Sequence, residues 1–199
     1  MATQFSMLGI MNAALISQAF EEVLSENDGS DEYRLLSRNW PTIVEAELEA
    51  GAYHYARQQA HLVSRQPGAF GYEDAYLVPL DALHVRRVWT EDDSGVRDFP
   101  DWSQDGTRIH VNNPEGVFIE YVHAADPSFW GANFSMGVQM KLEAVLLRFR
   151  EEYGAADRID LKGDDFFSVA RTMSSRSRSA KEPYREGKYI KAMRGWRRG

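Results

Sequence analysis

The chain has 199 residues, 43% of them hydrophobic, which is enough for one domain of ordinary size with a substantial core. It contains no cysteine, which excludes disulfides, thiolate chemistry and cysteine-based zinc sites and is typical of a protein made in a reducing cytoplasm. The net charge of −7 is unevenly spread, because residues 171–199 hold ten Lys/Arg and two Asp/Glu whereas residues 1–170 hold 13 and 28.

The N-terminal part is predicted to form two helices. Apolar residues recur at three- and four-residue steps from Gln4 to Val23, the pattern of a helix with one buried face. Polar residues interrupt this stretch, so we expect neither a signal peptide nor a membrane-spanning helix. Ser30 or Asp31 can cap a second helix, in which Pro41 predicts a kink or a break near Asn39.

The middle of the chain, residues 58–125, is predicted to be rich in β-strands. Leu83–Trp89 alternates apolar and polar side chains as a half-buried strand does, and Val117–Val122 carries apolar residues on both faces. The acidic stretch Glu91–Gly95 is predicted to be a solvated hairpin tip. A cation site is the alternative there, although three adjacent acids without a fixed ligand pattern do not make a calcium loop.

Helical periodicity then returns. Asp126 is predicted as a cap and Pro127 as the first helical position. A helix is expected from Asn133 to Tyr153, where Gly154 ends it, and another from Ala155 to about Ser179.

The last residues, 180–199, lack periodicity and are predicted to be an extended basic arm that is disordered alone. Aromatic side chains are interleaved with its charges, which favours an arm that folds on a protein partner, because a purely electrostatic nucleic-acid arm would need only the charges. Direct nucleic-acid binding and a solubilising tail are the alternatives. The candidate partner-binding residues are Arg176, Arg178, Lys181, Tyr184, Arg185, Lys188, Tyr189, Ile190, Lys191, Arg194, Trp196, Arg197 and Arg198.

The residues that could act in catalysis or bind a metal do not show the spacing typical of such sites. The histidines form no His-x-x-x-His pair, so ordinary sheet or surface positions are favoured over metal ligands. The acidic residues of the fourth predicted helix are interpreted as a solvated face in preference to a catalytic carboxylate pair. We predict no catalytic residue, no metal site and no cofactor; the groups considered are His54, His61, His84, His110, His123, Asp157, Asp160, Asp164 and Asp165.

Four short motifs follow one another between Ala50 and Trp89. They are Tyr53-His54-Tyr55-Ala56-Arg57, Phe70-Gly71-Tyr72, Tyr76-Leu77-Val78-Pro79, and the strand pattern of Leu83 to Val88. In this order and spacing they resemble the tail tubular protein A-like head-to-tail adaptor (connector) family of tailed bacteriophages. The layout of nearly the whole chain fits that family, which often has Trp at the position of Tyr53.

We therefore predict an α+β fold, with a four-helix bundle, a β-rich insertion between the second and third helices, and an extended C-terminal arm. Residues 1–57 and 126–179 would supply the bundle, residues 58–125 the insertion and residues 180–199 the arm.

The resemblance implies a structural virion protein, not an enzyme. Twelve copies would form a ring between the phage portal protein and a tail or nozzle protein, around the channel through which the genome is ejected without sequence-specific DNA binding. The chain would be made in the host cytoplasm and end at the head-tail interface of the virion. The arm, from about Ser174, would reach the portal, and the β section would face the tail. An acidic body suits a channel lining to which DNA should not adhere. The alternatives are a small DNA-binding protein using the basic tail, and an enzyme acting on a small ligand.

Overall fold

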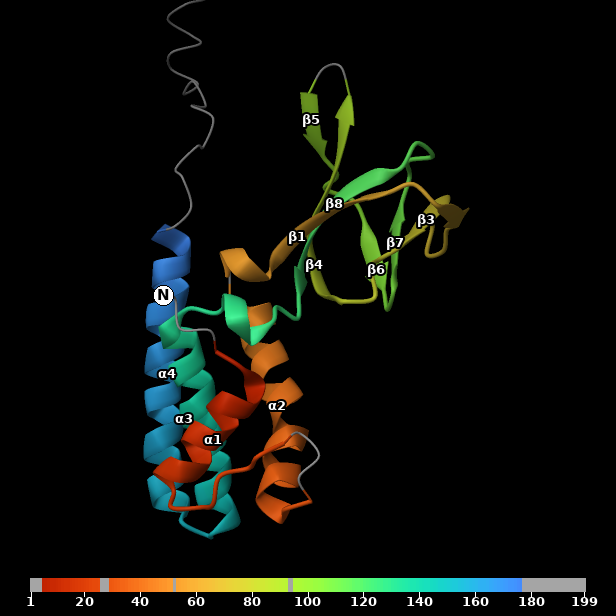
Figure 1. Ribbon diagram of the computed structural model, residues 1–199. Helices are drawn as coiled ribbons and strands as arrows, with labels where there is room; N and C mark the ends of the chain where they lie inside the picture. Colours follow the sequence, from red (N-terminus) through yellow and green to blue (C-terminus); the bar gives the residue numbers. More distant parts are fainter. Residues whose placement is uncertain (1–4, 26–28, 52, 93–94, 177–199) are drawn as a thin grey trace, which may run out of the picture.

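The computed structural model describes residues 5–25, 29–51, 53–92 and 95–176, and it places a helical part beside a β part (Figure 1). The helices of these residues are α1 (Met7–Ser17), α2 (Asp31–Ala50), α3 (Ala132–Phe149) and α4 (Tyr153–Arg176), with short 3-10 helices η1 (His54–Ala56) and η2 (Pro127–Phe129). The strands are β1 (Arg57–Leu62), β2 (Arg65–Pro67), β3 (Asp74–Leu77), β4 (Ala82–Asp92), β5 (Gly95–Asp98), β6 (Ser103–Asp105), β7 (Arg108–Val111) and β8 (Val117–His123).

The β part consists of two four-stranded antiparallel sheets, with strand orders β1-β8-β4-β5 and β2-β3-β7-β6. Alternate residues of β8 point to opposite faces, as a strand requires. Val117 and Ile119 therefore pack in the core of the β part against Ile109 of the second sheet, whereas Val122 packs in the helical core. At the acidic stretch, predicted as a hairpin tip, Asp92 of β4 pairs with Gly95 of β5, and Asp93 and Ser94 lie outside the described residues.

The four helices are not arranged as a four-helix bundle, so that part of the fold prediction is wrong. Helix α3 is central, because α1, α2 and α4 each pack against it and α1 and α2 contact each other little. The first helix has 11 residues whereas α4 has 24, and α1 lies obliquely across α3 in Figure 1. A helix this short cannot run the length of its neighbours, which a bundle requires.

The first helix ends early because its return segment is held on it. We predicted a helix up to Val23, but Ala19 takes a φ of +56° and the chain turns back along α1. The buried Asn12 side chain donates to the Val23 carbonyl oxygen at 2.8 Å and accepts from the Val23 N–H at 2.9 Å. These two bonds satisfy the backbone N–H and carbonyl groups of Val23, which lies outside the helix. Asn12, a polar residue on the apolar face of α1, thus stabilises the return segment and the early end of the helix.

Two further predictions about helix limits need correction. Of the kink or break predicted near Asn39, the break is absent: α2 continues through Pro41, because Leu36 and Val44 on either side of it are both buried in the helical core, and packing outweighs the lost backbone bond. Gly154 does not end α3 and lies in the first turn of α4. Glu151 takes the left-handed position instead, with a φ of +64°, while the Glu152 N–H donates to the Leu147 carbonyl oxygen at 2.9 Å. The predicted caps Ser30 and Asp126 are confirmed by their bonds to backbone N–H groups.

Candidate partner-binding site at the end of the last helix

The position of α4 is set by a close approach to α3. Gly137 of α3 lies under the ring of Phe167, where an added Cβ would come within 2.5 Å of the ring. Gly163 of α4 faces the same contact, since its Cβ would lie 3.3 Å from the Gly137 carbonyl oxygen. Two glycines thus let the backbones meet closely, and Phe167 fills the space beside them, fully buried.

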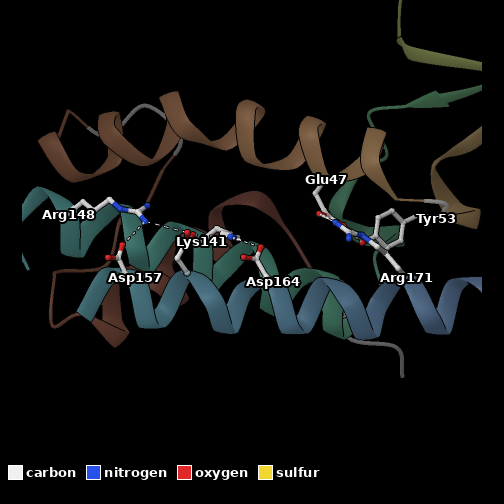
Figure 2. A network of polar contacts seen from close by, with 8 residues as sticks. Glu47, Tyr53, Lys141, Arg148, Asp157, Asp164 and Arg171 are labelled. Atoms are coloured by element: carbon white, nitrogen blue, oxygen red, sulfur yellow. Dashed lines mark hydrogen bonds and ion pairs between the residues drawn. The ribbon is translucent and has the colours of Figure 1, made fainter. Parts of the chain in front are cut away.

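The N-terminal half of α4 is tied to α3 by ion pairs. Lys141 Nζ lies 3.0 Å from Asp160 and 2.7 Å from Asp164, and Arg148 lies 3.4 Å from Asp157 and 3.3 Å from Asp160 (Figure 2). These acids were predicted to form a solvated face. The side chains of Asp157 and Asp164 are indeed largely exposed, but they and Asp160 also pair with cations of α3, which sequence spacing along α4 alone does not reveal.

Asp160 is shared between the two cations. Its partial burial would raise its pKa, but the hydrogen bonds and positive charges of Lys141 and Arg148 outweigh burial and hold the pKa below the ordinary value. The carboxylate is therefore ionised at neutral pH and joins both cations into one network.

The C-terminal half of α4 is fixed by a second group of side chains, Glu47, Tyr53 and Arg171, which we call the Glu47 anchor (Figure 2). Arg171 of α4 donates from Nε to Glu47 Oε1 at 2.8 Å and from Nη2 to Oε2, and the Tyr53 hydroxyl donates to Oε1. The Glu47 side chain, at the end of α2, is 8% exposed, so its charge depends on these donors. The anchor joins α2, α4 and the segment leading into β1.

Burial and the bond to Glu47 both raise the pKa of Tyr53 far above its ordinary value, so its hydroxyl stays protonated and donates. The same carboxylate raises the pKa of the Arg171 guanidinium, which stays charged. The Tyr53 hydroxyl and the Arg171 guanidinium thus both keep their protons near neutral pH, which fits a structural role for the anchor.

A pocket of about 210 Å³ opens beside the anchor, where η1, η2, the start of α3 and the end of α4 meet. We call it the junction pocket. Its floor includes the buried rings of Tyr53 and Phe134, which meet edge to face at 4.9 Å, and its rim carries Phe129 and Met173, which are 69% and 54% exposed. The other lining residues are His54, Tyr55, Trp130, Gly131, Ala132, Asn133, Ala170 and Ser174.

The walls of the junction pocket are held by polar contacts as well as packing. The His54 N–H donates to the Ser174 hydroxyl oxygen at 2.9 Å, so η1 is bound to the last turns of α4. The Trp130 indole N–H donates to the Ala125 carbonyl oxygen at 2.9 Å and its ring stacks on Trp40 at 5.6 Å. Contacts within the single chain therefore hold the walls of the pocket in place.

Of the thirteen predicted partner-binding residues, the structure describes Arg176, the exposed last residue of α4, whose neighbourhood contains the anchor and the junction pocket. The other twelve lie outside the described residues: Arg178, Lys181, Tyr184, Arg185, Lys188, Tyr189, Ile190, Lys191, Arg194, Trp196, Arg197 and Arg198.

Sequence reasoning missed the anchor. Arg171 was counted with the basic C-terminal residues, yet it is paired within the body. A usable signal existed, because Glu47 falls three residues after Val44 and next to Leu48 on the apolar face of α2. An acid at such a position has to find a cation or a hydrogen-bond donor.

The histidines are dispersed through the described residues, and no group of three or more His, Cys, Asp or Glu is placed there to hold a metal ion. His61 stacks on Phe118 with ring centres 4.0 Å apart, and His110 is buried in β7, where its Nδ1 accepts from the Ala69 N–H.

No family model matches the chain, and no curated protein matches it. In the part of the chain that the structure describes, no helix is both long and apolar enough to cross a membrane.

Proposed function

We propose that the chain is a structural virion protein, a head-to-tail adaptor of a tailed bacteriophage that forms a ring between the portal and the tail around the DNA channel. The observation that carries the proposal is the placement of the four resembling motifs. Tyr53–Arg57 links α2 to β1, Phe70–Tyr72 forms a turn in which Phe70 and Gly71 have positive φ, and Tyr76–Pro79 ends β3. The Leu83–Val88 motif lies in β4.

The buried residues of these motifs belong to the hydrophobic cores of the fold. Tyr53 and Ala56 are buried in the helical core, and Tyr76, Val85 and Val88 are buried in the β core. A family likeness carried by core and turn residues concerns the scaffold, and the proposed role depends on the surfaces that this scaffold presents.

The C-terminal residues are proposed to contact the portal. Residues 177–199 hold eight Lys/Arg and two Glu, and they follow directly from the end of α4, which the Glu47 anchor fixes to the body. A basic aromatic segment that starts from a fixed point can be directed at one partner surface.

The test uses the full chain and a chain lacking residues 180–199, each mixed with the purified portal of the same phage. Mass in solution is measured alone and with portal. We expect the full chain to assemble on the portal and the shortened chain to lose binding. If the shortened chain still binds the portal, residues 180–199 are not required for the interface, and this part of the proposal is wrong.

A DNA-binding role is the competing proposal, favoured by the net charge of +6 in residues 177–199. It predicts that the free chain binds duplex DNA with an affinity that falls steeply with salt. The adaptor proposal predicts little binding by the free chain at physiological salt, so the same sample titrated with duplex DNA separates the two.

A further inference from the structure

We propose that one aromatic side chain of the C-terminal segment, residues 177–199, occupies the junction pocket of its own chain. The structure leaves this pocket open at the place where the described part of α4 ends. Ser174 lines it, and Arg176 is two residues further on.

The first argument is the character of the pocket. Its volume of about 210 Å³ is below the range of about 300–1,000 Å³ that is usual for small-molecule sites, and its lining is dominated by aromatic and aliphatic groups. A single ring with a polar tip fits this description better than a metabolite. The occupant would also cover Phe129 and Met173, two large apolar side chains that the described residues leave exposed at the rim.

The second argument is reach. The segment carries Tyr184, Tyr189 and Trp196, and Tyr184 lies eight residues after Arg176. Eight residues span up to about 26 Å, which is ample for a return to a pocket beside the last turns of α4. A short linker gives an effective concentration in the mM range, so even a contact with an intrinsic Kd of about 1 mM is substantially occupied.

The third argument is charge. Residues 177–199 carry a net charge of +6, whereas residues 1–176 carry 15 Lys/Arg and 28 Asp/Glu, a net charge of −13. Complementary charge keeps the segment near its own body, and the aromatic ring supplies the specific contact. The walls are already fixed by the His54–Ser174 bond and by the Glu47 anchor, so little ordering of the pocket opposes docking.

Docking of this kind would compete with any partner that takes up the same aromatic side chains. A partner could bind only those chains in which the ring has left the junction pocket. The partner's apparent Kd would therefore equal its intrinsic Kd divided by the fraction of chains with the ring undocked. The inference does not depend on the adaptor role, because it concerns the chain alone.

The test exploits the absence of cysteine from the sequence. Phe129→Cys places one thiol at the rim of the junction pocket, and its rate of reaction with a maleimide reports how well the rim is covered. Met173→Cys is a second rim probe in case one substitution disturbs the pocket. Leu161→Cys is the control probe, because Leu161 is 65% exposed and lies about 20 Å along α4 from Ser174.

Each probe is measured in the full chain with and without three substitutions, Tyr184→Ser, Tyr189→Ser and Trp196→Ser. We expect loss of the aromatic rings to speed labelling at the rim by about three- to tenfold, as expected for a site that the mM effective concentration keeps mostly filled, and to leave the Leu161→Cys rate unchanged. A matched variant, with Arg178, Lys181, Arg185 and Lys188 changed to Gln and the rings intact, should keep most of the protection.

Equal rim rates with and without the rings would overturn the proposal. Protection that grows with protein concentration would overturn it too, because it would assign the occupant to a second copy. The proposal would also be overturned if the four Lys/Arg→Gln changes removed protection as fully as the three aromatic→Ser changes. Charge, and not an aromatic ring, would then hold the segment.

Discussion

At the scale of single residues, the end of α4 depends on a carboxylate that water scarcely reaches. Glu47 receives three donors, two from Arg171 and one from Tyr53, so the buried charge is fully compensated. A buried ion pair adds little net stability over an apolar pair, but the loss of one partner leaves the other charge without compensation. Arg171 is therefore a residue whose removal should be felt well beyond its own contacts.

Arg171→Ala should lower the free energy of unfolding by about 1–3 kcal/mol, the usual cost of leaving a buried polar group short of its partner. The half-exposed guanidinium and the remaining Tyr53 donor keep the loss below that of a fully buried charge. Urea unfolding at constant m-value measures it. Arg176→Ala is the control, because Arg176 is an exposed residue and should shift stability by no more than about 0.5 kcal/mol. Equal stability of the two variants would contradict the structural role of the anchor.

Asp160 should give the fold a measurable acid sensitivity. Its pKa is lower in the folded chain than the ordinary value of 3.8, because Lys141 and Arg148 outweigh the effect of burial. The stabilisation is complete above that ordinary pKa and is lost as the pH falls through the folded pKa, since the unfolded chain binds the proton more readily. The stability difference between the unchanged chain and Asp160→Asn should therefore be largest near pH 7 and shrink towards pH 3.

Urea midpoints at several pH values provide the measurement. Asp165→Asn removes a charge from the same helix without touching these ion pairs, and it serves as the control. A difference for Asp160→Asn that stays constant between pH 7 and pH 3 would show that the ion pairs contribute nothing.

At the scale of elements, local patterns predicted where helices exist better than where they end. Periodicity placed α2, α3 and α4 correctly in outline because a buried stripe repeats over several turns. Their limits depended on particular contacts that no spacing encodes. Asn12 binds the return segment and shortens α1, Glu151 takes the left-handed turn expected of a glycine, and packing carries α2 through Pro41.

The close contact between α3 and α4 predicts that a larger residue at Gly137 destabilises the fold. Gly137→Ala should lower the free energy of unfolding by about 1–3 kcal/mol through overpacking against Phe167, in spite of the better helix propensity of alanine. Gly154→Ala is the matched control in the first turn of α4, where an added Cβ meets nothing within 4 Å, and it should be neutral or slightly stabilising. Thermal or urea unfolding of both variants decides the matter. Equal effects would mean that the close approach is not tight in solution.

At the scale of the whole molecule, the described residues form two hydrophobic cores, one among the helices and one between the sheets. The alternating patterns of β4 and β8 predicted a β-rich middle, but the pairing of eight strands into two sheets could not be read from them. The prediction of a four-helix bundle was wrong because the first helix, expected from Gln4 to Val23, ends at Ser17 and crosses α3 obliquely (Figure 1). The junction pocket and the Glu47 anchor are assembled from residues more than a hundred positions apart, and local sequence patterns carry no such information.

Two cores predict two zones of stability. Ile119→Ala, a fully buried residue of the β core, should cost about 2–5 kcal/mol and speed hydrogen exchange mainly in the strands. Leu142→Ala in α3 is the matched change in the helical core, and it should act mainly on the helices. Mass spectrometry of exchanged peptides compares the two. Uniform acceleration across the chain in both variants would show that the parts unfold as one cooperative unit.

The Glu47 anchor also determines how tension on the C-terminus would travel. Arg171 lies within two turns of the end of α4 and binds Glu47 of α2, which also accepts a hydrogen bond from Tyr53 in the segment that leads into β1. A force applied to the C-terminus would therefore be shared by α4, α2 and the segment before β1. These parts would be loaded in shear, and α4 would not separate from α3 one turn at a time.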